Sequence, residues 1–212
     1  MMGNDRRDLF SEPQTSDPDF EQRLLADLEC IARPRHARWD EFGLLAVRSM
    51  LQVRLRELGP VEEHHFAEGR DAGVNLIVRL PGQRTDLDPI LVAAHYDGPL
   101  GSPGADDNAS AVAALLELGR RWVARPPVRP VWLVAFDQEE WGMVGSGVLA
   151  RELREQQQQL RLVVSLEMLG YTSERQHYPL DTMRAIYRDR GTSSPWSAIW
   201  VRRRCCCRLL RA

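Results

Sequence analysis

Lysine is absent from the 212-residue chain, and all 28 of its basic residues are arginine. The chain also lacks an apolar run of about 18 residues, which excludes a transmembrane helix. Its first residues lead into no apolar segment of the kind that secretory signals contain. We therefore predict a cytoplasmic protein with no membrane partner. A net charge of −2 argues against nucleic acid as the main partner.

Cysteine is scarce, and its spacing does not suit a structural role. Three of the four cysteines are adjacent, at residues 205–207, and fit neither a disulfide framework nor a zinc knuckle. Residues 191–212 also hold five arginines and no acid, a charge of +5, whereas residues 1–190 carry −7. One permissible DNA sequence for residues 192–200, when read one base earlier, encodes Asp-Phe-Ile-Ala-Leu-Val-Gly-Asn-Leu, which is a plausible strand. We therefore expect residues 191–212 to be an out-of-frame, non-native tail and the domain to be incomplete at its C-terminus.

Hydrophobic periodicity predicts an α/β domain over residues 19–190, after a loose lead-in over residues 1–18. The spacing of apolar residues predicts helices over about 20–31, 40–58, 111–123 and 148–160. Short strand-like runs at 61–66 and 74–80 are expected to form an antiparallel pair. Continuous apolar runs, typical of strands buried on both faces, occupy residues 90–94, 131–136 and 162–166. We predict a mixed, mainly parallel central sheet flanked by helices.

Each of these three buried runs is followed by residues that can bind a metal. His95 and Asp97 follow the first run, Glu139 and Glu140 the second, and Glu167 the third. Because ligands bind outside the carboxyl ends of parallel strands, we expect these side chains to meet at one edge of the sheet.

The loop after the first buried strand adds two more acids, Asp106 and Asp107. A single carboxylate at such a position is usually solvated or caps a helix, and Asp107 or Asn108 could cap the helix that begins near Ala111. Several acids at one edge, however, would repel each other without a cation. Asp106, Glu140, Glu167 and His95 together therefore predict a site for Zn²⁺ or another divalent ion.

Four short motifs occur in order along the chain: VAAHYD at 92–97, SPGADDNAS at 102–110, AFDQEEWG at 135–142 and SLEMLGY at 165–171. Together they resemble the zinc aminopeptidases of metallopeptidase family 28, whose relatives include glutaminyl cyclases. The resemblance covers about residues 20–190. It implies a zinc-dependent exopeptidase fold, two zinc ions in a complete site and a peptide or small aminoacyl substrate.

The resemblance also implies roles for individual residues. The implied zinc ligands are His95, Asp106, Glu140 and Glu167, with Asp106 shared between the two ions. Glu139 would be the general base that takes a proton from the metal-activated water. Asp97 would orient His95. The peptide bond after Asp106 would be cis.

One expected ligand is missing, because the family's second zinc takes a final histidine far downstream. Only His177 follows Glu167 in this chain. We therefore expect the site of His95, Asp106 and Glu167 to form, the site of Glu140 to be incomplete, and one zinc ion or none to bind. The main interpretation is a zinc aminopeptidase. Two alternatives stay open: a glutaminyl cyclase-like zinc acyltransferase and an inactive zinc-binding fragment.

Overall fold

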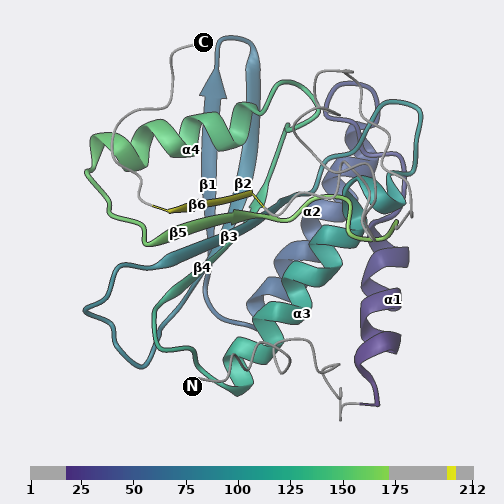
Figure 1. The fold of residues 1–212 in the computed structure, drawn as a ribbon. Coiled ribbons are helices and arrows are strands. Elements are labelled where there is room, and N and C mark those ends of the chain that lie inside the picture. Colours follow the sequence, from purple (N-terminus) through teal and green to yellow (C-terminus); the bar gives the residue numbers. More distant parts are fainter. Residues whose placement is uncertain (1–17, 172–199, 204–212) are drawn as a thin grey trace, which may run out of the picture.

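The computed structural model describes residues 18–171 and the backbone of residues 200–203. In these ranges the chain forms one mixed sheet with helices on both faces (Figure 1), which confirms the predicted mixed α/β class. His177 and all but the short segment 200–203 of the predicted tail lie outside the described residues. The domain and tail boundaries stay predictions.

Four α-helices occur in the described residues: α1 (Phe20–Ile31), α2 (Glu41–Arg56), α3 (Ala111–Ala124) and α4 (Val144–Glu155). The first three agree with the predicted helices to within a few residues. Helix α1 ends ahead of Pro34, which has no N–H to continue the helix. None of the helices in the described ranges is long and apolar enough to cross a membrane.

The sheet has the strand order β1-β2-β4-β3-β5-β6. Its strands are β1 (Val61–Glu68), β2 (Asp71–Leu80), β3 (Ile90–His95), β4 (Val131–Phe136), β5 (Leu162–Ser165) and β6 (Trp200–Arg203). Strand β3 lies between β4 and β5 and is parallel to both. The pairs β1–β2, β2–β4 and β5–β6 are antiparallel. The carboxyl ends of β3, β4 and β5 therefore meet at one edge, where His95 pairs with Phe136.

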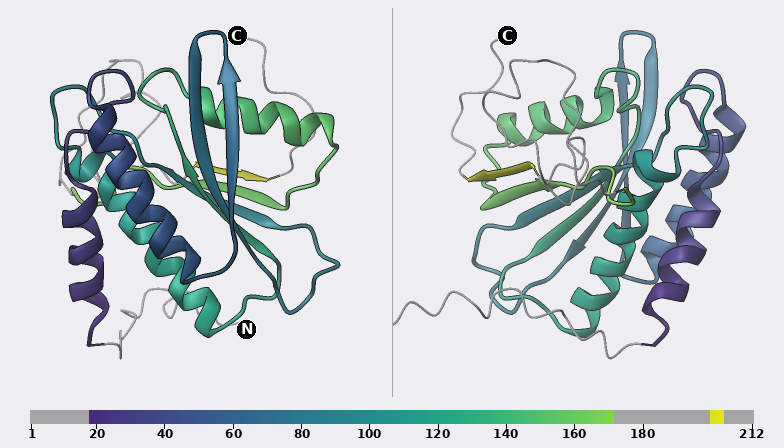
Figure 2. Two further views of the ribbon diagram at one scale, coloured as in Figure 1. Left: turned by 180° about the vertical axis from the view of Figure 1, so that it is seen from behind. Right: turned by 45° about the vertical axis from the view of Figure 1, so that its right-hand side comes forward.

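Different helices cover the two faces of the sheet (Figures 1 and 2): α1, α2 and α3 lie on one face and α4 on the other. Successive side chains of a strand point to opposite faces. Leu76 accordingly joins the core under α2 and α3, whereas Ile77 packs with Leu149 of α4. Burial on both faces explains why the central strands read as continuous apolar runs.

Helix α4 differs from its prediction, since it begins at Val144 and ends at Glu155 instead of spanning 148–160. Gln157 takes a left-handed conformation with φ of 55°. The N–H groups of Gln157 and Gln158 then bond back to the carbonyls of Arg154 and Leu153. This closed helix end leaves the glutamine run outside the helix.

Two buried acids and their partly exposed arginine partners join the three helices on the first face. Asp27 of α1 pairs with Arg54 of α2 and with Arg120 of α3. Glu117 of α3 is 3% exposed and pairs with Arg120 and with Arg23 of α1. Burial raises the pKa of Glu117, but the hydrogen bonds from Arg23 and Arg120 outweigh burial and leave that pKa below its usual value.

Candidate metal centre

His95 is the last residue of β3 and is buried, with 3% of its surface exposed. Its Nδ1 atom lies 3.2 Å from Oδ1 of Asp97. A carboxylate at one ring nitrogen fixes the tautomer and leaves the other nitrogen available as a metal ligand. The Nε2 atom of His95 is therefore the ring nitrogen that can bind a metal at this edge of the sheet.

Asp97 is fully buried, and its carboxylate contacts two backbone N–H groups in addition to the imidazole of His95. Its Oδ1 atom accepts a hydrogen bond from the backbone N–H of Glu139, and its Oδ2 atom accepts one from the N–H of Glu140, both at 3.0 Å. One carboxylate thus fixes the position of His95 relative to the loop that follows β4. These contacts place Asp97 beside His95, and its predicted role in orienting His95 stays a prediction.

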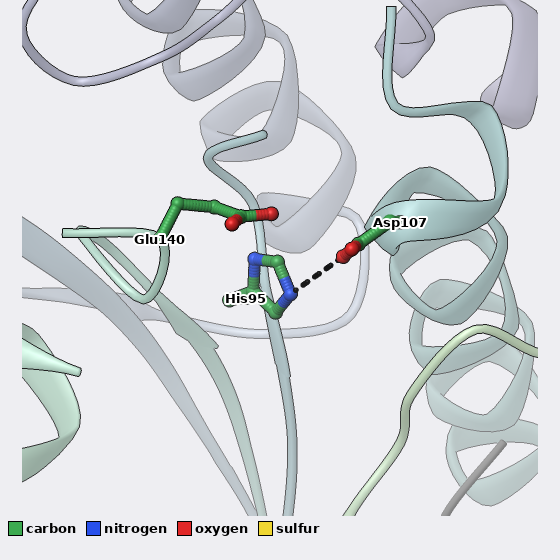
Figure 3. Close-up of side chains that lie close together, drawn as sticks. All are labelled: His95, Asp107 and Glu140. Carbon is green, nitrogen blue, oxygen red and sulfur yellow. Dashed lines mark ion pairs between the residues drawn. The ribbon is translucent and has the colours of Figure 1, made fainter. Parts of the chain in front are cut away.

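Three residues bring one donor atom each to within 4.8 Å of one another: His95, Asp107 and Glu140. Figure 3 shows the His95 ring close to both carboxylates, with Nε2 3.2 Å from Oδ1 of Asp107. The three side chains come from the end of β3, the irregular turn at Ala105–Ser110, and the loop after β4. The topology therefore gathers residues that are up to 45 positions apart in sequence at one point.

Two further carboxylates approach Nε2 of His95. Glu167 Oε1 lies 3.1 Å away and Glu139 Oε2 lies 3.9 Å away. The carboxylate of Glu167 is held by Nδ2 of the buried Asn108, which donates to its Oε2 atom at 2.6 Å. Asn108 also bonds the backbone on both sides of Glu167, through the carbonyl of Leu166 and the N–H of Met168.

The structure does not bring Asp106 into this cluster. Oδ1 of Asp106 accepts a hydrogen bond from the N–H of Gly170 at 2.7 Å, so this side chain ties down the loop after β5. The cis peptide bond also lies one residue later than expected, at Asp107–Asn108. In this irregular turn, neighbouring side chains point in different directions: Asp106 toward Gly170 and Asp107 toward His95.

Burial and neighbouring charges raise the pKa of the two acids in the loop after β4. Burial and the charge of Asp107 raise the pKa of Glu140 to about 7. Burial also raises the pKa of Glu139, against the opposing effect of His95 and with further repulsion from Glu167. Burial lowers the pKa of His95, but the neighbouring carboxylates of Asp107, Asp97 and Glu167 outweigh it and hold that pKa well above its usual value.

A bound cation would offset the repulsion between these carboxylates. Oε1 of Glu140 is buried and has no hydrogen-bond partner in the described part of the chain, and the buried Nε2 of His95 forms no well-directed hydrogen bond with the carboxylates around it. Buried polar atoms normally have partners, and converging carboxylates repel each other when no cation lies between them. An imidazole nitrogen with several carboxylate oxygens is a donor set that Zn²⁺ accepts. The residues present therefore fit a zinc ion.

Sequence reasoning did not select three residues that matter here: Asp107, Asn108 and Arg35. The only role expected for Asp107 or Asn108 was to cap α3, but the N-cap of that helix is Ser110. The Asp107 side chain lies beside His95, and that of Asn108 bonds to Glu167. The adjacent acids Asp106 and Asp107 were a visible signal, but spacing alone does not tell which of two neighbours faces His95. Nothing in the sequence around Arg35 indicates that its side chain is buried.

Known proteins with similar sequences point to one family. The profile described as Peptidase family M28 matches residues 75–199. Over 118 residues the chain is 39% identical to the uncharacterized protein YfbL of Escherichia coli, covering 48% of this chain and 36% of YfbL. Over 99 residues it is 34% identical to the aminopeptidase YwaD of Bacillus subtilis, covering 46% of this chain and 22% of YwaD. The matched region thus spans only about a fifth to a third of these relatives.

Solved structures with a similar fold include two kinds of enzyme. A glutaminyl cyclase from an Acidobacteriales bacterium superposes with a TM-score of 0.61 and 22% identity, covering 74% of this chain and 59% of that one. The LapA aminopeptidase of Legionella pneumophila superposes with a TM-score of 0.58 and 21% identity, covering 73% and 43%. At this level of identity the likeness shows the shared fold.

Proposed function

The chain belongs to peptidase family M28, and on this basis we propose that it is a zinc-dependent aminopeptidase, or part of one, that hydrolyses the N-terminal residue of peptides. The observation that supports this most is the convergence of His95, Asp107 and Glu140 at the carboxyl edge of the sheet. The name of the Bacillus subtilis relative supports the aminopeptidase class.

In this proposal, four residues hold metal. His95, Asp107 and Glu167 would bind one ion, and Glu140 with Asp107 would supply ligands for a second, whose site has no histidine of its own among the described residues. We give Asp107 the shared role that the family resemblance suggested for Asp106, because Asp107 lies 3.2 Å from His95 Nε2 and Asp106 bonds to Gly170. Zinc, when bound, supplies Lewis-acid chemistry that polarises a carbonyl group and acidifies water.

Glu139 would be the general base. Its side chain is 35% exposed, reaches to 3.9 Å from His95 Nε2, and is anchored at its backbone by Asp97. A carboxylate with a raised pKa can accept a proton from the attacking water and return it to the leaving amine. The acidic surroundings would also attract the free amino group of a peptide substrate, which is the basis for exopeptidase action. The cytoplasmic location stays a prediction.

Two other functions have specific support. A glutaminyl cyclase-like zinc acyltransferase is compatible with the fold that the chain shares with a glutaminyl cyclase, although the adjacent Glu139 and Glu140 favour the peptidase. An inactive zinc-binding fragment is supported by the donor set itself, since the cluster in the described residues contains one histidine, His95.

Metal analysis combined with two assays separates these functions. The purified chain is loaded with zinc, freed of excess metal and tested on aminoacyl p-nitroanilides and on a peptide with N-terminal glutamine. Hydrolysis of the anilides with bound zinc supports the aminopeptidase. Cyclisation of the glutaminyl peptide without anilide hydrolysis would favour the acyltransferase. Bound zinc with neither reaction would favour the inactive fragment.

A further inference from the structure

Arg35 lies in the connection between α1 and α2, well before residue 75, where the family match begins. It is the largest fully buried side chain in the described part of the protein. Arginine is rarely buried to this extent unless it is paired with an acid. In the described residues, however, its hydrogen bonds run to backbone carbonyl oxygens, those of Arg33, Tyr96, Pro103, Gly104 and Asp107.

These carbonyls connect two parts of the candidate metal centre. Nε of Arg35 donates at 2.9 Å to the carbonyl of Tyr96, the residue between His95 and Asp97. Nη2 donates at 2.9 Å to Gly104 and at 3.4 Å to Asp107 itself. One planar guanidinium therefore joins the end of β3, which carries His95, to the loop that carries Asp107.

The backbone around the guanidinium is shaped to admit it. A Cβ atom on Gly98 would lie 3.0 Å from Cζ of Arg35. Gly104 has a φ of +54°, and a Cβ atom there would lie 2.2 Å from the carbonyl oxygen of Asp107 and 3.0 Å from Nη2 of Arg35. Glycine at these two positions leaves the room that the buried side chain occupies.

The charge of Arg35 suits its surroundings. Burial lowers the pKa of the guanidinium to about 10, while the charges of Asp97, Asp107 and Glu140 act in the opposite direction. The group is therefore charged at neutral pH. A buried cation costs free energy unless polar groups surround it, and here carbonyl dipoles and a nearby acidic cluster do so.

We propose that Arg35 is a positioning residue of the metal centre: its guanidinium fixes the loop at Pro103–Asp107 and so sets the place of the Asp107 carboxylate beside His95. This inference rests on the proposed function, because it concerns the zinc ligand Asp107. It assigns a part of the centre to a segment outside the family match.

The test uses the full chain, two Arg35 variants and a control. Arg35→Met removes the donors and the charge, whereas Arg35→Lys keeps the charge without the planar fork. Arg120→Met is the control, because its partners are Asp27 and Glu117 in the network between the helices. For each protein, the zinc dissociation constant is measured by competition with a chromophoric chelator, and the absorption spectrum of the Co²⁺ complex and the unfolding temperature without metal are recorded.

We expect Arg35→Met to weaken zinc binding by about 10–100-fold and to change the Co²⁺ spectrum, as the loss of supporting contacts does at other metal sites. Arg35→Lys should weaken binding in the same direction, and it decides the question if Arg35→Met does not fold. Arg120→Met should lower the unfolding temperature and leave zinc affinity and spectrum unchanged. Folded Arg35 variants with wild-type affinity and spectrum would overturn this inference alone. A wild-type chain that binds no zinc would overturn the proposed function and this inference with it.

Discussion

The Oδ2 atom of Asp97 accepts a hydrogen bond from the backbone N–H of Glu140 at 3.0 Å. The same carboxylate accepts the N–H of Glu139 and contacts Nδ1 of His95. Because all three partners can donate, an ionised carboxylate satisfies them and an amide cannot. The end of β3 and the loop after β4 are therefore joined through one buried acid.

Replacing this acid should disturb zinc binding. Asp97→Asn places an NH₂ group against an N–H donor, so we expect zinc affinity to fall by about 10–100-fold and the unfolding temperature to decrease. Chelator competition and thermal unfolding measure the two effects. Asp88→Asn, at an exposed position in the loop before β3, is the control and should change neither. Wild-type zinc affinity in Asp97→Asn would show that Asp97 does not orient His95.

Replacing Glu139 should reduce turnover and leave zinc binding unchanged. Glu139→Gln keeps the size and the backbone contact to Asp97 but cannot accept a proton. We expect hydrolysis of aminoacyl anilides to fall by about 10²–10⁴-fold, the usual contribution of a general base. Zinc content, measured on the same sample, should match that of the wild type. Loss of zinc together with activity would instead make Glu139 a ligand.

Acid stability should depend on Glu117. Its pKa is lowered in the folded chain, so it stabilises the fold above the pKa of the unfolded state, about 4.3, and this contribution is lost as the pH falls through the lower folded value. Glu117→Gln should lower the free energy of unfolding at pH 7 by about 1–3 kcal/mol, and the difference should shrink below about pH 4.

Urea titrations at a series of pH values measure this difference. Glu57→Gln serves as the control, because Glu57 is 52% exposed and pairs with Arg54 only at 3.5 Å. It should change stability little at any pH. A Glu117→Gln effect that is equal at pH 7 and pH 3 would mean that the carboxylate charge is not what stabilises the three helices.

Strong periodic patterns in the sequence predicted most of the fold. The apolar runs at 131–136 and 90–94 match β4 and nearly all of β3, because strands buried on both faces admit no polar alternation. The predicted end of α4 was wrong. The observed end depends on a left-handed conformation at Gln157, and a glutamine gives no local signal for that conformation.

The sequence predicted where in the fold the candidate site lies better than it predicted which residues form it. His95 ends β3, Glu140 lies in the loop after β4 and Glu167 follows β5, so their place at one edge follows from parallel pairing. The choice between Asp106 and Asp107 depends on the path of an irregular turn. That path is held in part by Arg35, far away in sequence, and pattern reasoning has no access to such a contact.

The zinc content of two neighbouring variants tests the central claim most directly. Wild type, Asp107→Asn and Asp106→Asn are each loaded with zinc, freed of excess metal and analysed by mass spectrometry, with circular dichroism to confirm folding. Asp107 lies beside His95 Nε2, so Asp107→Asn should retain little or no zinc. Asp106 bonds to Gly170, so Asp106→Asn should retain zinc at the wild-type level with a lower unfolding temperature. Wild-type zinc content in folded Asp107→Asn, or loss of zinc in Asp106→Asn alone, would contradict the account.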